Sequence, residues 1–134
     1  MTGTPLISAT RSAAIAAPPH TVIDLVADPR RLPEWAPAFA ARVEERGGGV
    51  WTVATGPGPG RDIRVRRSDA LGVVDFVSVG QPDRGAFLRV LRDGPGSHVT
   101  FTIVFPAEAD PEAVAEEMRG VEQELAALGE LLAP

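Results

Sequence analysis

The sequence predicts an α+β fold in which a curved antiparallel sheet of about seven strands wraps around a long C-terminal helix. Short segments rich in β-branched residues are separated by glycine turns, a pattern typical of an antiparallel meander. A single apolar stripe runs through residues 111–133 at helical spacing. Because consecutive antiparallel strands twist and cannot stay flat, such a helix can cover the concave side of the sheet.

The N-terminal part is predicted to form one strand followed by two short helices. Residues 6–15 alternate between apolar and polar side chains, which predicts a strand. Pro18 and Pro19 suit the first turn of a helix, where the backbone N–H has no partner. The Asp-Pro pair at 28–29 ends this helix, because the residue before a proline avoids helical backbone angles. A second short helix or turn is expected at about 30–36.

Strands and turns then alternate as far as residue 105. The expected strands cover residues 39–45, 50–55, 62–68, 71–79, 86–92 and 99–105. The glycines at 47–49 predict a hairpin turn, and the glycine–proline repeat at 56–60 cannot form regular structure. A further turn is expected at 93–97. Short strands joined in this way favour antiparallel pairing between neighbours.

The C-terminal helix carries the clearest local signals. Asp110 is a good N-cap, Pro111 suits the first helical position, and Glu112 favours the positive end of the helix dipole. The apolar stripe consists of Val114, Met118, Val121, Leu125, Leu128 and Leu132. The glutamates occupy other positions and are expected to be solvated: Glu116, Glu117, Glu122, Glu124 and Glu130. At 1.5 Å per residue, about 23 residues reach roughly 35 Å, enough to cross a small sheet.

The segment from Ile15 to Trp35 combines several motifs in a fixed order. A strand ends at Ile15-Ala-Ala-Pro18, a helix with apolar valines follows, and then come Asp28-Pro29 and Trp35. This order resembles the N-terminal region of the SRPBCC superfamily, which includes the START, Bet v 1 and polyketide cyclase/dehydrase-like proteins. The resemblance implies a helix-grip fold, a single domain over residues 1–134, and a small-molecule cavity between the sheet and the C-terminal helix.

The resemblance leaves several functions open. One is an enzyme of secondary metabolism that acts on a hydrophobic organic substrate, similar to small bacterial polyketide cyclases and dehydratases. The alternative is a non-catalytic carrier, sensor or sequestering protein for a hydrophobic ligand, which the sparse inward polar residues favour. A protein-interaction module, like the superfamily members that assist chaperones, would need a large exposed apolar patch, and none is evident in the sequence. Whether the protein is a monomer or a homodimer is also open.

Composition limits the partners and the chemistry. A net charge of −5 argues against a nucleic-acid ligand, and the absence of lysine beside thirteen arginines suggests a GC-rich bacterial genome. No apolar run approaches the roughly 18 residues of a membrane span, and no signal-peptide pattern begins the chain, so a cytoplasmic location is expected. Cysteine and tyrosine are absent, which excludes thiolate and phenol chemistry. With only two histidines, neither near carboxylates at ligand spacing, no metal or other cofactor is expected.

Asp75 and Arg89 are the candidate catalytic residues. Asp75 interrupts the apolar segment 73–77. If it faces the cavity unpaired, burial raises its pKa and it can act as a general acid or base. The other possibility turns its strand neighbours inward and Asp75 toward solvent. Arg89 has apolar neighbours and could hold an oxyanion, extend to the cavity rim, or pair with Asp75 on a facing strand.

Six further residues are candidate ligand contacts: Arg11, Trp35, Trp51, Phe87, Phe101 and Met118. Arg11 interrupts the apolar face of the first strand and could bind an anion or extend to the rim. Trp35 could close the cavity mouth or pin the short helices to the sheet, and Trp51 could be a wall or an edge residue. Phe101 and Met118 are expected in the core, where they line the cavity if the core is hollow.

Overall fold

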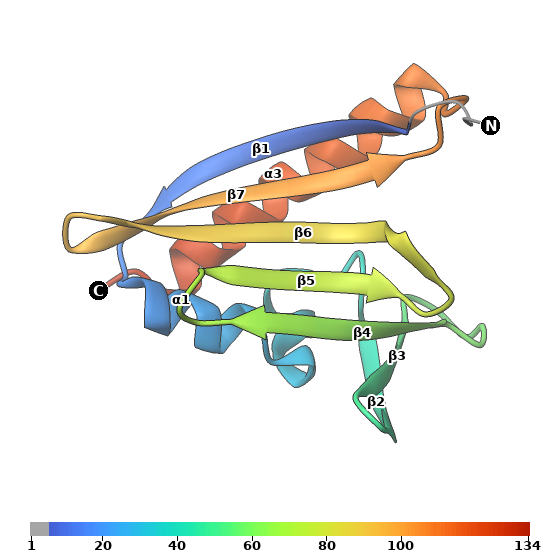
Figure 1. The fold of residues 1–134 in the computed structure, drawn as a ribbon, viewed down its shortest axis with the longest axis horizontal. Helices are drawn as coiled ribbons and strands as arrows, with labels where there is room; N and C mark the ends of the chain where they lie inside the picture. The colour runs from blue at the N-terminus through green and yellow to red at the C-terminus, as the bar shows by residue number, and fades with distance from the viewer. Residues whose placement is uncertain (1–5) are drawn as a thin grey trace.

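The computed structural model describes residues 6–134, which form one curved sheet, three α-helices and one short 3-10 helix (Figure 1). The elements are, in chain order, β1 (Ile7–Ile15), α1 (Pro19–Val26), η1 (Pro29–Arg31), α2 (Leu32–Trp35), β2 (Arg42–Gly47), β3 (Val50–Ala54), β4 (Arg61–Ser68), β5 (Val73–Ser78), β6 (Gln81–Asp93), β7 (Gly96–Phe105) and α3 (Pro111–Leu131). This is the predicted α+β class.

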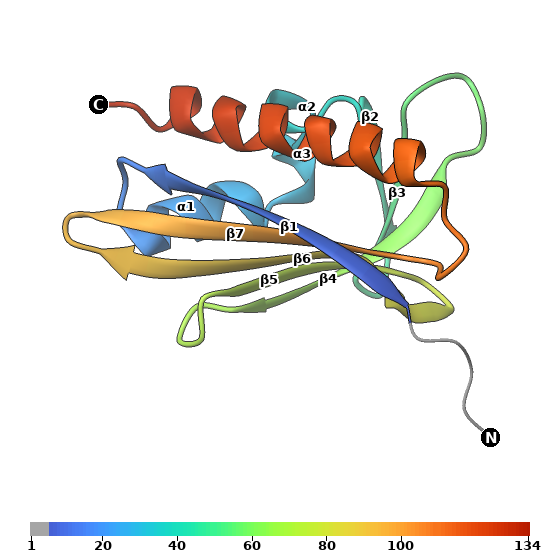
Figure 2. The same ribbon diagram turned by 90° about the horizontal axis from the view of Figure 1, so that it is seen from above.

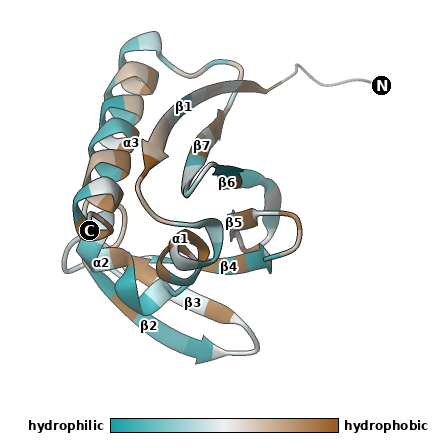
Figure 3. Cartoon of the chain, turned by 90° about the vertical axis from the view of Figure 1, so that its left-hand side faces the viewer, coloured by the Kyte–Doolittle hydropathy of each residue, from teal (hydrophilic) through white to brown (hydrophobic). Residues whose placement is uncertain are grey.

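The seven strands form one antiparallel sheet in the order β1-β7-β6-β5-β4-β3-β2. β1 and β2 are the two edge strands, and the short helices that connect them cross the sheet, where α1 contacts β5, β6 and β7. The sheet curves around α3, which runs along its concave side and packs against β1, β7 and α2 (Figures 2 and 3). The predicted helix-grip arrangement is confirmed.

Prolines and one aspartate set the short helices after β1. Pro19 is the first residue of α1, where its missing N–H costs no hydrogen bond. α1 ends at Val26, next to the Asp-Pro pair that predicted its end. The Asp28 carboxylate accepts a hydrogen bond from the backbone N–H of Arg30 at 3.0 Å and so caps η1, which begins at Pro29.

Two strand boundaries differ from the prediction. Phe39 lies in a turn before β2, where its N–H donates to the carbonyl of Ala36 at 3.0 Å, so the strand expected from residue 39 begins later. β6 begins at Gln81 and not near residue 86, because pairing with β5 resumes beyond a register shift at Ser78. Neither change alters the strand order.

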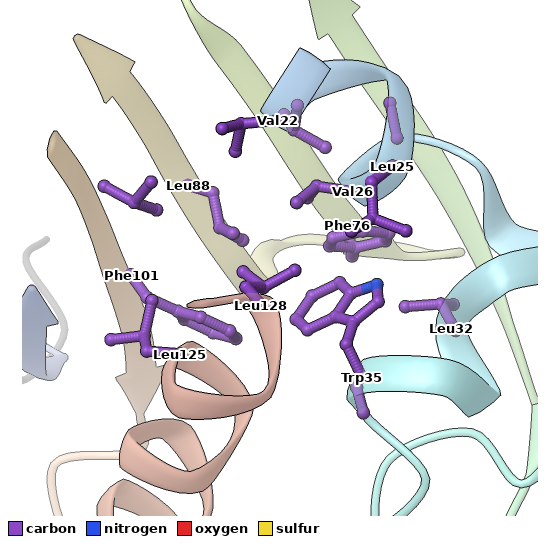
Figure 4. Close-up of a cluster of buried hydrophobic side chains, with 14 of the residues drawn as sticks. Val22, Leu25, Val26, Leu32, Trp35, Phe76, Leu88, Phe101, Leu125 and Leu128 are labelled. Atoms are coloured by element: carbon purple, nitrogen blue, oxygen red, sulfur yellow. The ribbon is translucent and has the colours of Figure 1, made fainter. Parts of the chain in front are cut away.

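The core fills the space between the concave face, α3 and the short helices (Figure 4). Trp35 is 2% exposed, and its ring centroid lies 6.4 Å from that of Phe76 and 6.4 Å from that of Phe101. The middle of the predicted apolar stripe on α3 is buried in this core: Met118, Val121, Leu125 and Leu128. Across residues 6–134, no helix combines the length and the apolar character needed to cross a membrane.

Candidate functional site

A pocket of about 570 Å³ lies between the concave face of the sheet, α2 and α3. Buried side chains form its inner wall: Leu32, Trp35, Ala36, Ile63, Phe76 and Phe101. Exposed lining residues mark its mouth: Arg61, Asp62, Val79, Gln81 and Glu117. Small-molecule sites typically measure about 300–1,000 Å³ and combine apolar walls with a few polar groups. The pocket therefore has the dimensions of a ligand site.

Strand alternation explains the composition of the inner wall. Phe101 and Ile103 both point to the concave side of β7. Ala86 of β6 is paired with Ile103, and Phe76 of β5 is paired with Ala86. Directly paired residues share a face of the sheet, so this row crosses three strands on the pocket side. The small side chain of Ala86 leaves space between its two larger neighbours.

Trp35 closes the inner end of the pocket from the side of α2. Figure 4 shows its indole ring beside Phe76 and Leu128, with the ring nitrogen turned toward the side of Leu32. This Nε1 is the one buried side-chain polar atom without a hydrogen-bond partner within residues 6–134. An unpaired buried donor costs about 1–3 kcal/mol, so packing and not hydrogen bonding holds this ring in place.

Glu124 is the pocket's most strongly perturbed titratable group. It lines the pocket from α3 and is partly buried, and within the described chain no side-chain hydrogen bond or ion pair reaches its carboxylate. Burial, and then the like charge of Glu117, raises the pKa of Glu124 to about 7. A carboxyl group that titrates near neutral pH can donate or accept a proton under ordinary conditions.

Two arginines lie across the pocket from these glutamates, on the sheet. Arg61 begins β4, and its guanidinium carbon lies 5.0 Å from the ring centroid of Phe39. Arg84 lies in β6 and is half-buried. In the part of the chain that the structure describes, neither arginine forms an ion pair. The pocket thus joins an apolar interior to a mouth where Arg61, Arg84 and Asp62 lie on the sheet and Glu117 lies on α3.

Asp75 and Arg89 lie on the convex face, outside the pocket. Of the two placements of Asp75 left open by the sequence, the outward one is present, because Val74 and Phe76 face the core and Asp75 alternates with them. The catalytic role that required it to face the cavity is therefore not supported. Asp75 is nevertheless 4% exposed, since two arginines cover it. Its carboxylate lies 2.7 Å from Nη1 of Arg89 and 3.2 Å from Nη2 of Arg66. The pair between Asp75 and Arg89, one of the possibilities for these facing strands, is present, and together with Arg66 it joins β4, β5 and β6 on the outer surface.

Two of the six candidate ligand contacts, Trp35 and Phe101, line the pocket. Arg11 is paired with Phe101 in the sheet and therefore faces the concave side, but it is not part of the lining. Its Nε donates to Glu122 of α3 at 2.8 Å, which ties the edge strand to the helix. Arg11 is thus already engaged by a carboxylate of the protein.

The other three candidates also lie outside the pocket lining. The guanidinium carbon of Arg30 lies 4.8 Å from the ring centroid of Trp51, which packs beside the short helices. Phe87 is paired with Asp75 and so faces the convex side. Met118 is 1% exposed and belongs to the filled part of the core.

Glu117 and Glu124 were expected to be solvated, and for Glu124 that expectation is wrong. The sequence does indicate which glutamates face the pocket, through their angular position around the helix axis. At about 100° per residue, Glu124 lies about 40° and Glu117 about 20° from Leu128 around the helix, whereas Glu130 lies on the far side. The two residues flank the buried stripe on the side that meets the pocket. This position predicts that both residues face the pocket, but only Glu124 is partly buried, and Glu117 is exposed at the mouth.

The helix-grip fold, with a pocket between sheet and C-terminal helix, defines an SRPBCC-type protein. A family model described as "Polyketide cyclase / dehydrase and lipid transport" matches residues 7–133. The chain belongs to this polyketide cyclase/dehydrase-like family. No curated protein matches it.

Solved structures share the fold at low sequence identity. The protein XoxI from Bacillus cereus is 21% identical with a TM-score of 0.73, over 93% of this chain and 94% of that one. Zhui aromatase/cyclase from Streptomyces sp. R1128 is 18% identical with a TM-score of 0.69, over 96% and 94%. The Aha1 dimer from Colwellia psychrerythraea is 15% identical with a TM-score of 0.72, over 94% and 96%. These likenesses establish the fold.

Proposed function

We propose that the protein binds a hydrophobic small organic molecule in the pocket between the sheet and α3, with Glu124 as its main polar contact from the helix. The observation that carries this proposal is the combination of an aromatic inner wall with one partly buried, unpaired carboxyl group. Apolar surface provides affinity through burial, and a single polar group orients the molecule. Family membership supports the same function.

A cyclase- or dehydratase-like enzyme is the catalytic form of this proposal. Glu124, with its pKa raised to about 7, would take a proton from a carbon next to a carbonyl group. It would then return that proton to the neighbouring hydroxyl group, which leaves as water while a carbon–carbon double bond forms. The aromatic wall would hold the chain folded, and orientation would supply much of the rate gain.

The second candidate is a non-catalytic carrier or sensor. The observation that favours it is the inner wall itself, where Trp35, Phe76 and Phe101 offer apolar surface and no general acid or base. In this case Glu124 contributes only a hydrogen bond to the ligand. The two candidates share the pocket and differ in whether the bound molecule changes.

Binding can be tested with the neutral fluorescent dye N-phenyl-1-naphthylamine. We expect the wild-type protein to bind it, and Ala86→Trp to weaken binding by about tenfold or more because an indole fills the inner space. Ala14→Trp is the matched control, since Ala14 is exposed on β1 and paired with His98 on the outer face. Equal losses in the two variants, or no binding by the wild type, would reject the pocket as the site.

Native mass spectrometry of protein purified from its own host separates the enzyme from the carrier. A dehydrating enzyme should retain product in the wild type and a precursor heavier by one water molecule in Glu124→Gln. A carrier should retain the same molecule in both proteins. The variant preserves the shape of the side chain and removes its acid–base function.

A further inference from the structure

Two arginines line the pocket from the sheet, and two glutamates line it from α3. Arg61 and Arg84 extend from the sheet, whereas Glu117 and Glu124 extend from α3. The sheet side also carries Asp62, whose carboxylate accepts a hydrogen bond from Oγ1 of Thr52 at 2.6 Å. The pKa of Glu124 is raised by burial and by Glu117, and no arginine contributes to lowering it. Within residues 6–134, no ion pair joins Arg61 or Arg84 to either helix carboxylate.

Local structure orients Arg61 toward the pocket. It lies two residues before Ile63 on β4, and residues at that spacing share a face of a strand. Ile63 is 2% exposed and belongs to the inner wall. The Arg61 guanidinium lies over the ring of Phe39, at 5.0 Å from its centroid. Stacking of this kind covers the face of a guanidinium and leaves its N–H edge available for an anion.

Arg84 supplies a second cation from the neighbouring part of the sheet. It lies on β6 two residues before Ala86, and both residues line the pocket. Arg84 is half-buried and, among residues 6–134, is joined by no hydrogen bond or ion pair to a carboxylate. Other arginines within residues 6–134 are paired with carboxylates, such as Arg66 and Arg89 on the convex face and Arg11 of β1.

We propose that Arg61 and Arg84 form a subsite for the anionic group of the ligand, which is then an amphipathic aromatic or polycyclic carboxylate and not a neutral hydrocarbon. This inference rests on the proposed function. The ring system packs on the inner wall, and the carboxylate accepts charge-assisted hydrogen bonds from the two guanidinium groups. Glu117 and Glu124 repel an anion, so the ligand binds in one orientation, with an uncharged oxygen toward the helix.

Two dyes that share one ring skeleton test this subsite directly. 1-Anilinonaphthalene-8-sulfonate carries a sulfonate, and N-phenyl-1-naphthylamine lacks it. At pH 8 and low salt, the wild-type protein should bind the sulfonate dye about tenfold more tightly, as expected for one charge-assisted hydrogen bond. Arg61→Gln/Arg84→Gln should abolish this preference, so that the variant binds the two dyes with equal affinity.

The control removes the same charge elsewhere. Arg92→Gln/Arg119→Gln takes two arginines from exposed positions that do not line the pocket, and it should keep the preference for the sulfonate dye. Arg61→Lys/Arg84→Lys keeps the positive charge but removes the planar guanidinium groups with their paired N–H donors. This variant should retain part of the preference for the sulfonate dye. All three double variants are checked for folding by circular dichroism.

The outcomes separate the two proposals. If the neutral dye binds in the pocket but the sulfonate dye binds no more tightly, the anion subsite is rejected and the hydrophobic site stands. The same conclusion follows if the control variant loses the preference as fully as Arg61→Gln/Arg84→Gln. If neither dye binds, the pocket is not a ligand site and both proposals fail.

Discussion

The two faces of the sheet differ in whether a buried carboxyl group is paired with a cation. On the convex face, Asp75 is 4% exposed and lies between two arginines, at 2.7 and 3.2 Å. On the concave side, Glu124 is partly buried without a cation beside it, and its pKa rises to about 7. Both carboxyls are removed from water, but only one is neutralised by the protein.

This difference indicates which carboxyl group is structural and which is available for chemistry. A carboxylate held by two guanidinium groups has its hydrogen-bonding capacity used inside the fold, where it fixes neighbouring strands. A carboxyl group without such partners keeps a free acceptor and a proton that exchanges near neutral pH. Burial alone therefore does not identify a functional acid, because its partners decide its role.

Asp75→Ala tests the convex face and should have the largest effect. The change leaves Arg66 and Arg89 without their shared anion. Because both guanidinium groups are about half exposed, we expect the free energy of unfolding to fall by about 2–3 kcal/mol, less than for a fully buried pair. Urea unfolding measures it. N-phenyl-1-naphthylamine binding should persist, since Asp75 is outside the pocket.

Asp69→Ala is the matched control for that prediction. Asp69 also accepts from an arginine, Arg67, at 2.7 Å, but its side chain is exposed. We expect a smaller loss of stability than for Asp75→Ala, because water replaces the lost partner. If the two variants lose equal stability, the convex cluster is no stronger than a surface ion pair.

Glu124→Gln tests the concave side and should change the dependence of stability on pH. The pKa of Glu124 is raised from 4.5 to about 7, so between these values the folded state keeps a proton that the unfolded state loses. Stability contributed by this group is therefore complete below pH 4.5 and is lost as the pH rises toward 7. Glu124→Gln should remove that loss and raise the free energy of unfolding at pH 8 by about 2 kcal/mol.

Urea unfolding of both proteins across this pH range provides the measurement. The difference between wild type and variant isolates Glu124 from the other titrating groups. A constant difference at all pH values would contradict the assignment, because it would show that the carboxyl group titrates alike in the folded and unfolded states.

The fold could be predicted because its signals are local. Asp110 does accept a hydrogen bond from the N–H of Glu112, at 3.4 Å, and Pro111 does begin α3. The glycines of the β2–β3 hairpin have positive φ, from 62 to 92°, as a tight turn requires. Each of these features depends on residues within one turn of each other, so the sequence reveals them directly.

The site depended on contacts that the sequence does not reveal. The four central residues of β5 are all buried, so the segment around Asp75 shows no alternation from which its face could be assigned. Only the register, with Asp75 paired to Phe87 and Arg66, places it on the convex side. Glu124 was missed for another reason: a glutamate on an amphipathic helix is ordinarily solvated. Its angle to Leu128 does not distinguish it, because Glu117 lies closer in angle and is exposed.

Glu117→Gln should have the smallest effect of these substitutions. It separates the two causes that raise the pKa of Glu124. Burial is the larger cause and the like charge of Glu117 the smaller. We therefore expect the pKa of Glu124 to fall when Glu117 is neutralised, but to stay above its ordinary value of 4.5. Carbon-13 NMR titration of the glutamate carboxyls measures this pKa directly.

Glu116→Gln provides the control, because Glu116 is exposed, does not line the pocket and pairs with Arg119. It removes one charge from the same helix and should leave the pKa of Glu124 in place. A return of the Glu124 pKa to its ordinary value in Glu117→Gln would show that repulsion, and not the pocket, raises it. The contrast between the two faces would then result from the repulsion between Glu117 and Glu124 on α3. Burial in the pocket would no longer explain a carboxyl group that titrates near neutral pH.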